Sequence, residues 1–293
     1  MSTGPAPSAR GLSPGAAALA IGLLLAPLAV PPAGADYHER PGPPGETVVL
    51  DGSSGMIPLM GQIAAAFRQQ APNIRVELGK GLGTGARMRA LSEGKIHAAL
   101  NSHVLKPEEI TRGGLQVHEI ARAAVVFAVD AAIPVTALTG QQLCNVYAGR
   151  ITNWRELGGP DRSIVVLSRP PQEVDSEVIR EQISCFRDLK AAPHVKVMAR
   201  AGDMARGLQA EPGTLGLTSR VVVDQSRGRL KALGLDGTVP TPDNVTSGRY
   251  PLIRHFFLVT RGEPGPAMAR LLAFIRGEEG ARVISRAGAV PVR

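Results

Sequence analysis

The chain is poor in the residues on which several common chemistries depend. Its 293 residues include two cysteines, one tryptophan and three tyrosines, and aromatic side chains make up 3% of the sequence. Its six histidines are scattered without H-E-x-x-H or comparable spacing, so we expect no metal site. The sequence has no basic run, no aromatic platform and no zinc-finger spacing, which argues against a nucleic-acid partner.

Two glycine-containing stretches approach enzyme motifs but fail their spacing. A nucleophile elbow reads G-x-S-x-G, whereas the glycines of "DGSSGM", residues 51–56, are one residue too close. The run "GKGLGTGARMRAL", residues 79–91, lacks the Gly-Lys-Ser/Thr of a P-loop. From Gly81 it fits a loose dinucleotide pattern, but Asn101-Ser102 stands where an acidic residue would hold a ribose. We therefore expect no catalytic residue, no cofactor and no enzymatic activity.

The overall composition is that of a globular, loop-rich protein. Hydrophobic residues make up 44% of the chain, which also has 34 glycines and 24 prolines. Its length allows two lobes with cores of their own. With 33 basic and 25 acidic residues the formal net charge is +8, which favours anionic partners without choosing among them.

The N-terminus predicts export. Residues 1–35 carry one charge, Arg10, before a short apolar stretch over residues 16–30, and Ala33-Gly34-Ala35 has the small-x-small form of a signal peptidase site. We interpret residues 1–35 as a cleaved signal peptide rather than a retained anchor, and expect a periplasmic mature protein. Residues 36–45, rich in proline and glycine, are expected to form a flexible lead-in. The two cysteines, Cys144 and Cys185, form either a disulfide in that oxidising compartment or two independent buried thiols.

Hydrophobic patterning predicts an α/β fold in two blocks. In the first block apolar strand-like segments at residues 47–52, 74–78 and 96–101 alternate with helix-like ones, which is typical of a parallel sheet. The pattern resumes at residue 122. The tail has a strand over residues 253–260 and one long amphipathic helix from Pro266 to about Ala287.

Small polar residues and glycines follow the predicted strands. In parallel α/β sheets ligands bind beyond the carboxyl ends of the strands, where helix N-termini offer free backbone N–H groups to anions. A single Gly/Ser turn is commonly an ordinary connection, but several at one sheet edge favour a site. The turns concerned are Gly52-Ser53-Ser54-Gly55, Gly83-Thr84-Gly85, Asn101-Ser102-His103 and Ser168-Arg169.

These stretches resemble the phosphate-binding proteins of ABC-type import systems over nearly the whole mature chain. The matching segments are "GSSGM", "GLGTGARMRAL", "LTGQQLCNVYAGRITNWRELGG", "IVVLSR" and "TPDNVTSGRYPLIRHFFLVTRGEPG". The resemblance implies a two-lobed periplasmic-binding-protein-like fold of type II, with the ligand in a cleft between the lobes. It also implies a membrane ABC permease as partner and a monomeric protein. We expect one lobe over residues 46–123 with 247–293 and the other over residues 124–246.

The sequence departs from the family at one turn that binds the ligand. Family members carry Ser-Gly-Thr-Arg after the strand that here ends at Ser168-Arg169, but this chain reads "PPQEVDSEV", which brings in Glu173 and Asp175. The family's proton-accepting Asp aligns near Ser102, which cannot reject a deprotonated anion by charge repulsion. The cleft is therefore expected to be preserved while its selectivity is not.

Several charged and polar residues near this turn have competing interpretations. Arg87 and Arg169 could supply the missing positive charge, although a solvated arginine is the better expectation for Arg87. Asp175 is expected to cap the helix that starts near Ser176, and His103 to lie at the cleft edge as a polar residue rather than a ligand.

Two functional hypotheses follow. The first is a binding protein for phosphate or a related oxyanion; the second is an exported scaffold or sensor of the same fold that acts through a protein partner. The intact glycine and serine turns favour the first, and the lost turn favours the second. The predicted ligand-binding residues are Ser53, Ser54, Gly55, Gly83, Thr84, Gly85, Ser102, Ser168, Arg169 and Ser176.

Overall fold

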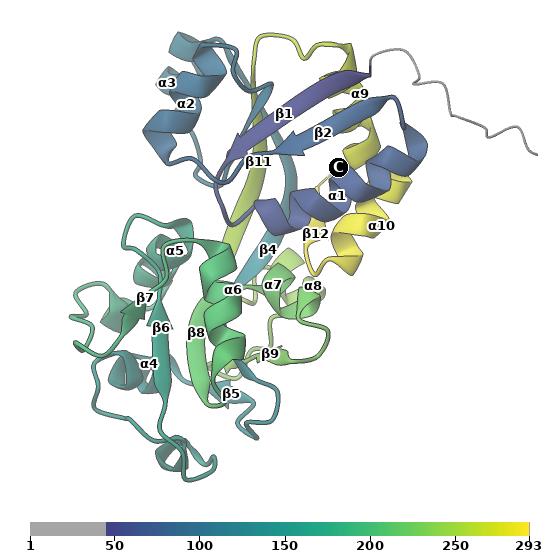
Figure 1. Ribbon diagram of the computed structural model, residues 1–293. Helices are drawn as coiled ribbons and strands as arrows, with labels where there is room; N and C mark the ends of the chain where they lie inside the picture. Colours follow the sequence, from purple (N-terminus) through teal and green to yellow (C-terminus); the bar gives the residue numbers. More distant parts are fainter. Residues whose placement is uncertain (1–44, 293) are drawn as a thin grey trace, which may run out of the picture. The chain divides into compact units, whose positions relative to one another are not determined.

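The computed structural model describes residues 45–292 (Figure 1). The predicted signal peptide, and all of the predicted lead-in except Gly45, lie outside these residues. Within the described part, no helix is both long enough and apolar enough to cross a membrane. The mixed α/β architecture expected from the sequence is confirmed.

Three parallel β-strands begin the first half of the fold. They pair in the order β2-β1-β3, and helices α1 and α2 connect them. Strand β3 is buried at every position, and α1 buries Leu59, Met60, Ile63 and Phe67 on one face. The bounds are β1 Glu46–Gly52, α1 Ile57–Gln70, β2 Ile74–Leu78, α2 Thr84–Ser92, β3 Ala98–Asn101 and α3 Pro107–Gly113.

Strand β4, Leu115–Asp130, connects the two halves of the sheet. Residues 115–124 pair antiparallel with β11, Ile253–Arg261, which itself lies against β3. Residues 125–129 pair antiparallel with β8, Thr214–Ser219, so one strand contributes to both halves (Figure 1). The sheet is therefore mixed, because the parallel strands predicted from the sequence are joined to antiparallel ones.

The second half is built on β8, which pairs with β6, and β6 with β7, both in parallel. Helix α6 packs on β8 (Figure 1). The remaining bounds in this half are β5 Ala137–Leu138, α4 Gly140–Tyr147, η1 Trp154–Leu157, β6 Val165–Ser168, α5 Val174–Gln182, η2 Ser184–Phe186, β7 Lys196–Val197, α6 Ala201–Ala210, α7 Arg220–Gln225, β9 Leu230–Ala232, β10 Gly234–Leu235 and α8 Pro242–Thr246.

The C-terminal segment forms two helices where one was predicted. Helix α9 spans Pro266–Arg276 and α10 spans Glu278–Arg286, and β12, Val290–Pro291, follows them. Gly277 between the helices has ψ 174°, an extended conformation that ends α9 and serves as the N-cap of α10. Residues 276–279 are all exposed and interrupt the pattern of buried positions, so the helix that was predicted as continuous ends at Arg276.

Buried apolar side chains form separate hydrophobic clusters in the two halves. In the first half, the first hydrophobic cluster draws on residues 48–123 together with residues 256–289 and also includes Val221, and a smaller cluster consists of Leu91, Ile96, Ala99, Phe257 and Val259. The second hydrophobic cluster, in the other half, is built from residues 124–252. The change from one cluster to the other falls between Ala123 and Ala124 on β4. The lobe boundaries themselves stay a prediction.

Cys144 on α4 and Cys185 on η2 form a disulfide with an S–S distance of 2.02 Å. Of the two alternatives that the sequence left open, the structure has the bonded one. The bridge joins α4 to the segment that follows α5, and both cysteines belong to or pack against the second hydrophobic cluster.

Candidate functional site

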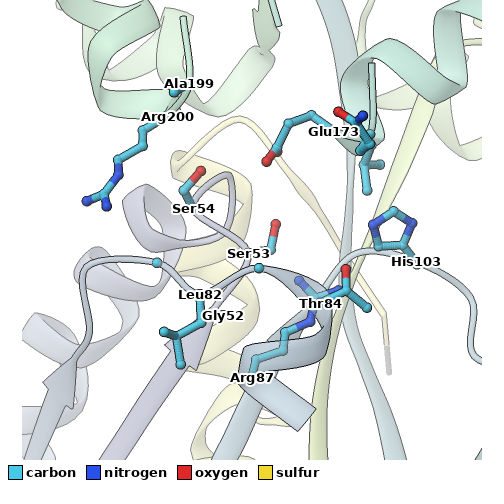
Figure 2. A pocket seen from close by; sticks show the side chains of 14 residues that line it. Gly52, Ser53, Ser54, Leu82, Thr84, Arg87, His103, Glu173, Ala199 and Arg200 are labelled. Carbon is cyan, nitrogen blue, oxygen red and sulfur yellow. The ribbon is translucent and has the colours of Figure 1, made fainter. Parts of the chain in front are cut away.

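A cavity of about 320 Å³ lies where β1, the loop before α2, and the starts of α5 and α6 meet (Figure 2). Its lining combines small residues and hydroxyls with both signs of charge. The residues that line it are Gly52, Ser53, Ser54, Gly81, Leu82, Gly83, Thr84, Arg87, His103, Gln172, Glu173, Val174, Ala199 and Arg200.

Two glycines shape the wall of this cavity. Gly52 has φ +144°, and a Cβ there would lie 2.3 Å from the carbonyl oxygen of Leu100. Gly81 has φ +102°, which L side chains rarely adopt. The carboxylate of Asp51 holds both by accepting hydrogen bonds from the amides of Gly52 (2.7 Å) and Gly81 (2.9 Å). The backbone amides of Gly52 and Gly81 therefore already donate to a carboxylate of the protein and are not available to a ligand.

The start of α2 offers unused backbone donors to the cavity. Gly83 is its N-cap, with no side-chain cap, and Thr84 is its first residue. Within residues 45–292 the amides of Gly83, Thr84 and Gly85 have no acceptor. Free N–H groups at the positive end of a helix dipole form an anion-binding arrangement, and the Thr84 hydroxyl lies beside them. Gly85 itself does not line the cavity.

Arg87 lies on the same helix, one turn further along. We expected a solvated side chain, and this was wrong: Arg87 is 3% exposed and lines the cavity. Its Nη2 donates to Oδ1 of Asn101 at 2.6 Å, and its Nε has no partner among the described residues. Burial lowers the pKa of the Arg87 guanidinium, and the negative charge of Glu173 acts in the opposite direction.

Ser53, which lines the cavity, and Ser102, which does not, lie together as the strand-end argument predicted. They contact an arginine that the sequence analysis did not select. The Ser102 hydroxyl donates to that of Ser53 at 3.2 Å. Arg254, on β11, donates through Nη2 to Ser102 (3.0 Å) and to Ser53 (3.4 Å). Gly55 packs against the same guanidinium, where a Cβ would come within 2.4 Å of Nη1.

Asp175 does not cap α5, contrary to expectation. The N-cap of α5 is Glu173, and Asp175 lies inside the first turn. Its carboxylate accepts from Nη1 of Arg254 at 2.6 Å, and both side chains are buried. Burying a guanidinium without a counter-charge is costly. Asp175 supplies this counter-charge to Arg254 and does not cap the helix.

The polar groups of the turn after β6 form hydrogen bonds with other groups of the protein. Arg169 donates to the carbonyl of Met198 (2.7 Å) and to Oε2 of Glu173 (2.9 Å). The Ser176 hydroxyl donates to the carbonyl of Arg169 at 3.1 Å, and the carbonyl of Ser168 accepts from the Met198 amide. None of Ser168, Arg169 and Ser176 lines the cavity, so the structure gives these predicted ligands other partners.

Contacts between the two halves border the cavity. The Ala201 amide, at the start of α6, lies 3.4 Å from the Ser54 hydroxyl and donates to it. Arg200 donates to the carbonyl of Lys80 at 3.2 Å. His103 lies at the cavity edge as predicted and pairs with Glu177, with Nδ1 and Oε2 3.1 Å apart.

The cavity is equipped to bind an anion with hydrogen-bond donors. Its donors include the amides of α2, the Thr84, Ser53 and Ser54 hydroxyls, and the guanidinium groups of Arg87 and Arg200. Glu173 is an acidic exception among them. Among residues 45–292 no group of three or more His, Cys, Asp or Glu side chains is placed to hold a metal ion.

Comparison with known proteins identifies the family. The family model described as "PBP superfamily domain" matches residues 38–279. The chain belongs to the PBP superfamily. The phosphate-binding protein PstS of Bacillus subtilis is 27% identical over 251 residues, which cover 84% of this chain and 81% of that protein. The protein of the same name from Borreliella burgdorferi is 21% identical, covering 84% and 90%.

Solved structures agree with this assignment. A substrate-binding protein of Clostridium perfringens with bound phosphate is 28% identical, with a TM-score of 0.72, and the match covers 85% of this chain and 100% of that one. A phosphate transport receptor of Vibrio cholerae is 26% identical, with a TM-score of 0.59 and coverage of 83% and 99%. The two-lobed α/β fold expected of this superfamily member is therefore confirmed.

Two charged residues at or near the cavity, Arg254 and Arg200, escaped the sequence analysis, and the position of a third, Glu173, was not foreseen. Arg254 stands inside an apolar strand pattern, where a single arginine in an otherwise buried strand is itself a signal for a buried partner. Arg200 precedes a helix in a segment without a glycine or serine turn. Glu173 was noted as a charge that disturbs the site, but not as a side chain facing the cavity.

Proposed function

We propose that this superfamily member is an extracytoplasmic solute-binding protein that binds phosphate or a related oxyanion and delivers it to an ABC-type importer. The observation that carries the proposal is the start of α2. There free backbone amides, the Thr84 hydroxyl and the buried, incompletely paired Arg87 all border one cavity. The names of the Bacillus subtilis and Clostridium perfringens relatives support phosphate as the first ligand to test.

The ligand set follows from this cavity. Ser53, Ser54, Gly83 and Thr84 are the predicted ligand residues that line it, and Arg87 joins them. Gly55, Gly85, Ser102, Ser168, Arg169 and Ser176 become residues that support the site. We propose that two lobes bind and release the ligand, one over residues 46–123 with 247–293 and the other over residues 124–246. The separate hydrophobic clusters support this division, and so does β4, which runs from one half into the other.

The protein acts without catalysis, as a monomer, and without nucleic acid. The relatives named above are binding proteins, which supports a binding role. Export is supported by the sequence of residues 1–35, and the mature chain would begin near Asp36. Mass spectrometry of the exported protein tests this, since a retained Met1 would contradict it.

Isothermal titration of the mature protein with phosphate tests the function, with sulfate, molybdate and methylphosphonate as competitors. Arg87→Gln should weaken phosphate binding at least about tenfold, because it removes a charged donor from a buried site. Arg89→Gln, on an exposed position of the same helix, is the matched control. No heat with any oxyanion up to the millimolar range, organic phosphates and phosphonates included, would rule the function out.

A second candidate is a superfamily scaffold or sensor that acts through a protein partner. The buried pair of Arg254 and Asp175 favours it, since a carboxylate of the chain already neutralises an arginine beside the predicted oxyanion residues Ser53 and Ser102. The same titration separates the two candidates, because a scaffold would give no heat.

A further inference from the structure

Glu173 places a carboxylate in a cavity that otherwise offers donors. Its Oε2 accepts a hydrogen bond from Arg169 at 2.9 Å, and its side chain is 34% exposed. Within residues 45–292 its Oε1 has no hydrogen-bond donor. Figure 2 shows this carboxylate turned toward the same space as the hydroxyls of Ser53, Ser54 and Thr84.

Oε2 of Glu173 is paired with Arg169, whereas Oε1 has no donor of its own among the described residues. A fully deprotonated oxyanion in this cavity would bring only further negative oxygens to Oε1. A carboxylate oxygen can accept hydrogen bonds but cannot donate them when ionised. The ligand that suits both sides therefore presents anionic oxygens to α2 and a donor, preferably a cationic one, to Glu173.

The size of the cavity points the same way. Its volume of about 320 Å³ is near the lower end of small-molecule sites, which begin at roughly 300 Å³. A tetrahedral oxyanion has five covalently bonded heavy atoms and therefore fills less space than five water molecules of the liquid, which take about 150 Å³. Roughly half of the cavity or more is left for a short organic group that reaches from the anion site to Glu173.

From these observations we infer that the ligand is a small zwitterionic organophosphate or phosphonate. Its tetrahedral anion lies at the start of α2 beside Thr84 and Arg87, and its ammonium group pairs with Oε1 of Glu173. The inference rests on the proposed function, because it assigns the anion to the same site. It adds the substrate class, and it gives Glu173 the role of selecting against oxyanions that offer its Oε1 no hydrogen-bond donor.

The test compares phosphoethanolamine with propyl phosphate, which replaces the ammonium by a methyl group of similar size, and with inorganic phosphate. Titration of the mature wild-type protein should give phosphoethanolamine about 10- to 100-fold tighter binding than propyl phosphate, the range expected for a charge-assisted hydrogen bond. 2-Aminoethylphosphonate and propylphosphonate repeat the comparison without a hydrolysable ester.

Glu173→Gln should reduce that preference to a few-fold, because the amide keeps the size and loses the charge. Glu181→Gln, an exposed position on the same helix, should retain it. Circular dichroism establishes that both variants are folded, and if Glu173→Gln is not, the wild-type comparison decides alone.

The outcomes separate the inference from the function on which it rests. Equal binding of propyl phosphate and phosphoethanolamine, or tighter binding of inorganic phosphate, overturns the zwitterionic ligand and leaves an oxyanion-binding protein. A preference that survives in folded Glu173→Gln overturns the role of that residue. Binding of none of these compounds overturns the proposed function and the inference together.

Discussion

The guanidinium of Arg254 and the carboxylate of Asp175 form a buried ion pair, with Nη1 and Oδ1 2.6 Å apart and side chains 2% and 5% exposed. The two residues are 79 positions apart, on β11 and α5 respectively. Arg254 also donates to Ser53 and Ser102, so one side chain ties the strand ends of the first half to the helix of the second. The ring of Phe256 lies 5.1 Å from its guanidinium carbon and covers it further.

Asp175→Asn should destabilise the protein by about 3–5 kcal/mol, because it leaves the buried guanidinium of Arg254 without a counter-charge. Urea denaturation followed by circular dichroism measures the change. Asp203→Asn breaks the surface pair with Arg206 and is the matched control, with an expected cost of at most about 1 kcal/mol. Equal stability of Asp175→Asn and wild type would show that the pair does not hold the halves together.

Thr84→Ala should weaken oxyanion binding by about 1.5–3 kcal/mol, since it removes one charge-assisted hydrogen bond and leaves the amides of α2 in place. Titration calorimetry with phosphate or phosphoethanolamine measures the effect. Thr111→Ala on α3, whose hydroxyl donates to the carbonyl of Pro107 away from the cavity, should bind like wild type. If Thr84→Ala also binds like wild type, the anion is not at this helix start.

The disulfide should contribute about 4 kcal/mol to stability, because it closes a loop of 41 residues and restricts the unfolded chain. The prediction is a lower urea midpoint for the protein treated with dithiothreitol. The double variant Cys144→Ser with Cys185→Ser should start from that lower midpoint and be insensitive to the reductant. A midpoint that does not change on reduction would contradict the contribution.

Acidification should cost part of the stability through Glu119. Burial raises the pKa of this carboxyl, but hydrogen bonds from Arg122 and His255 outweigh burial and hold its pKa below the ordinary value. A depressed carboxyl pKa contributes stability above the unfolded pKa, about 4.3 for glutamate, and loses it as the pH falls through the folded pKa. Glu119→Gln should therefore be less stable at pH 7 and lose less between pH ~5 and ~3. Urea denaturation at several pH values measures the stability of both proteins. An equal loss of stability in wild type and Glu119→Gln across that range would refute the prediction.

The sequence by itself determined the elements and the edge of the sheet at which the site lies. Alternating strand-like and helix-like segments predicted β1 to β3 with their helices, because hydrophobic periodicity reports which face of a local element is buried. Glycine and serine turns located the strand ends and the start of α2, because the backbone conformations they allow are local properties. The convergence of Ser53 with Ser102 followed from parallel-strand geometry alone.

Only the tertiary structure decided which charges face the cavity and which are already paired. Arg87 was expected in solvent and is buried against Asn101, whereas Arg169 is held by Met198 and Glu173. The partner of Arg254 could not be predicted, because Asp175 reaches it only when α5 of one half packs against β11 of the other. Whether a charged side chain is paired or free to bind a ligand depends on neighbours that are distant in sequence. The distances between these charges are set by tertiary packing and not by any local sequence pattern.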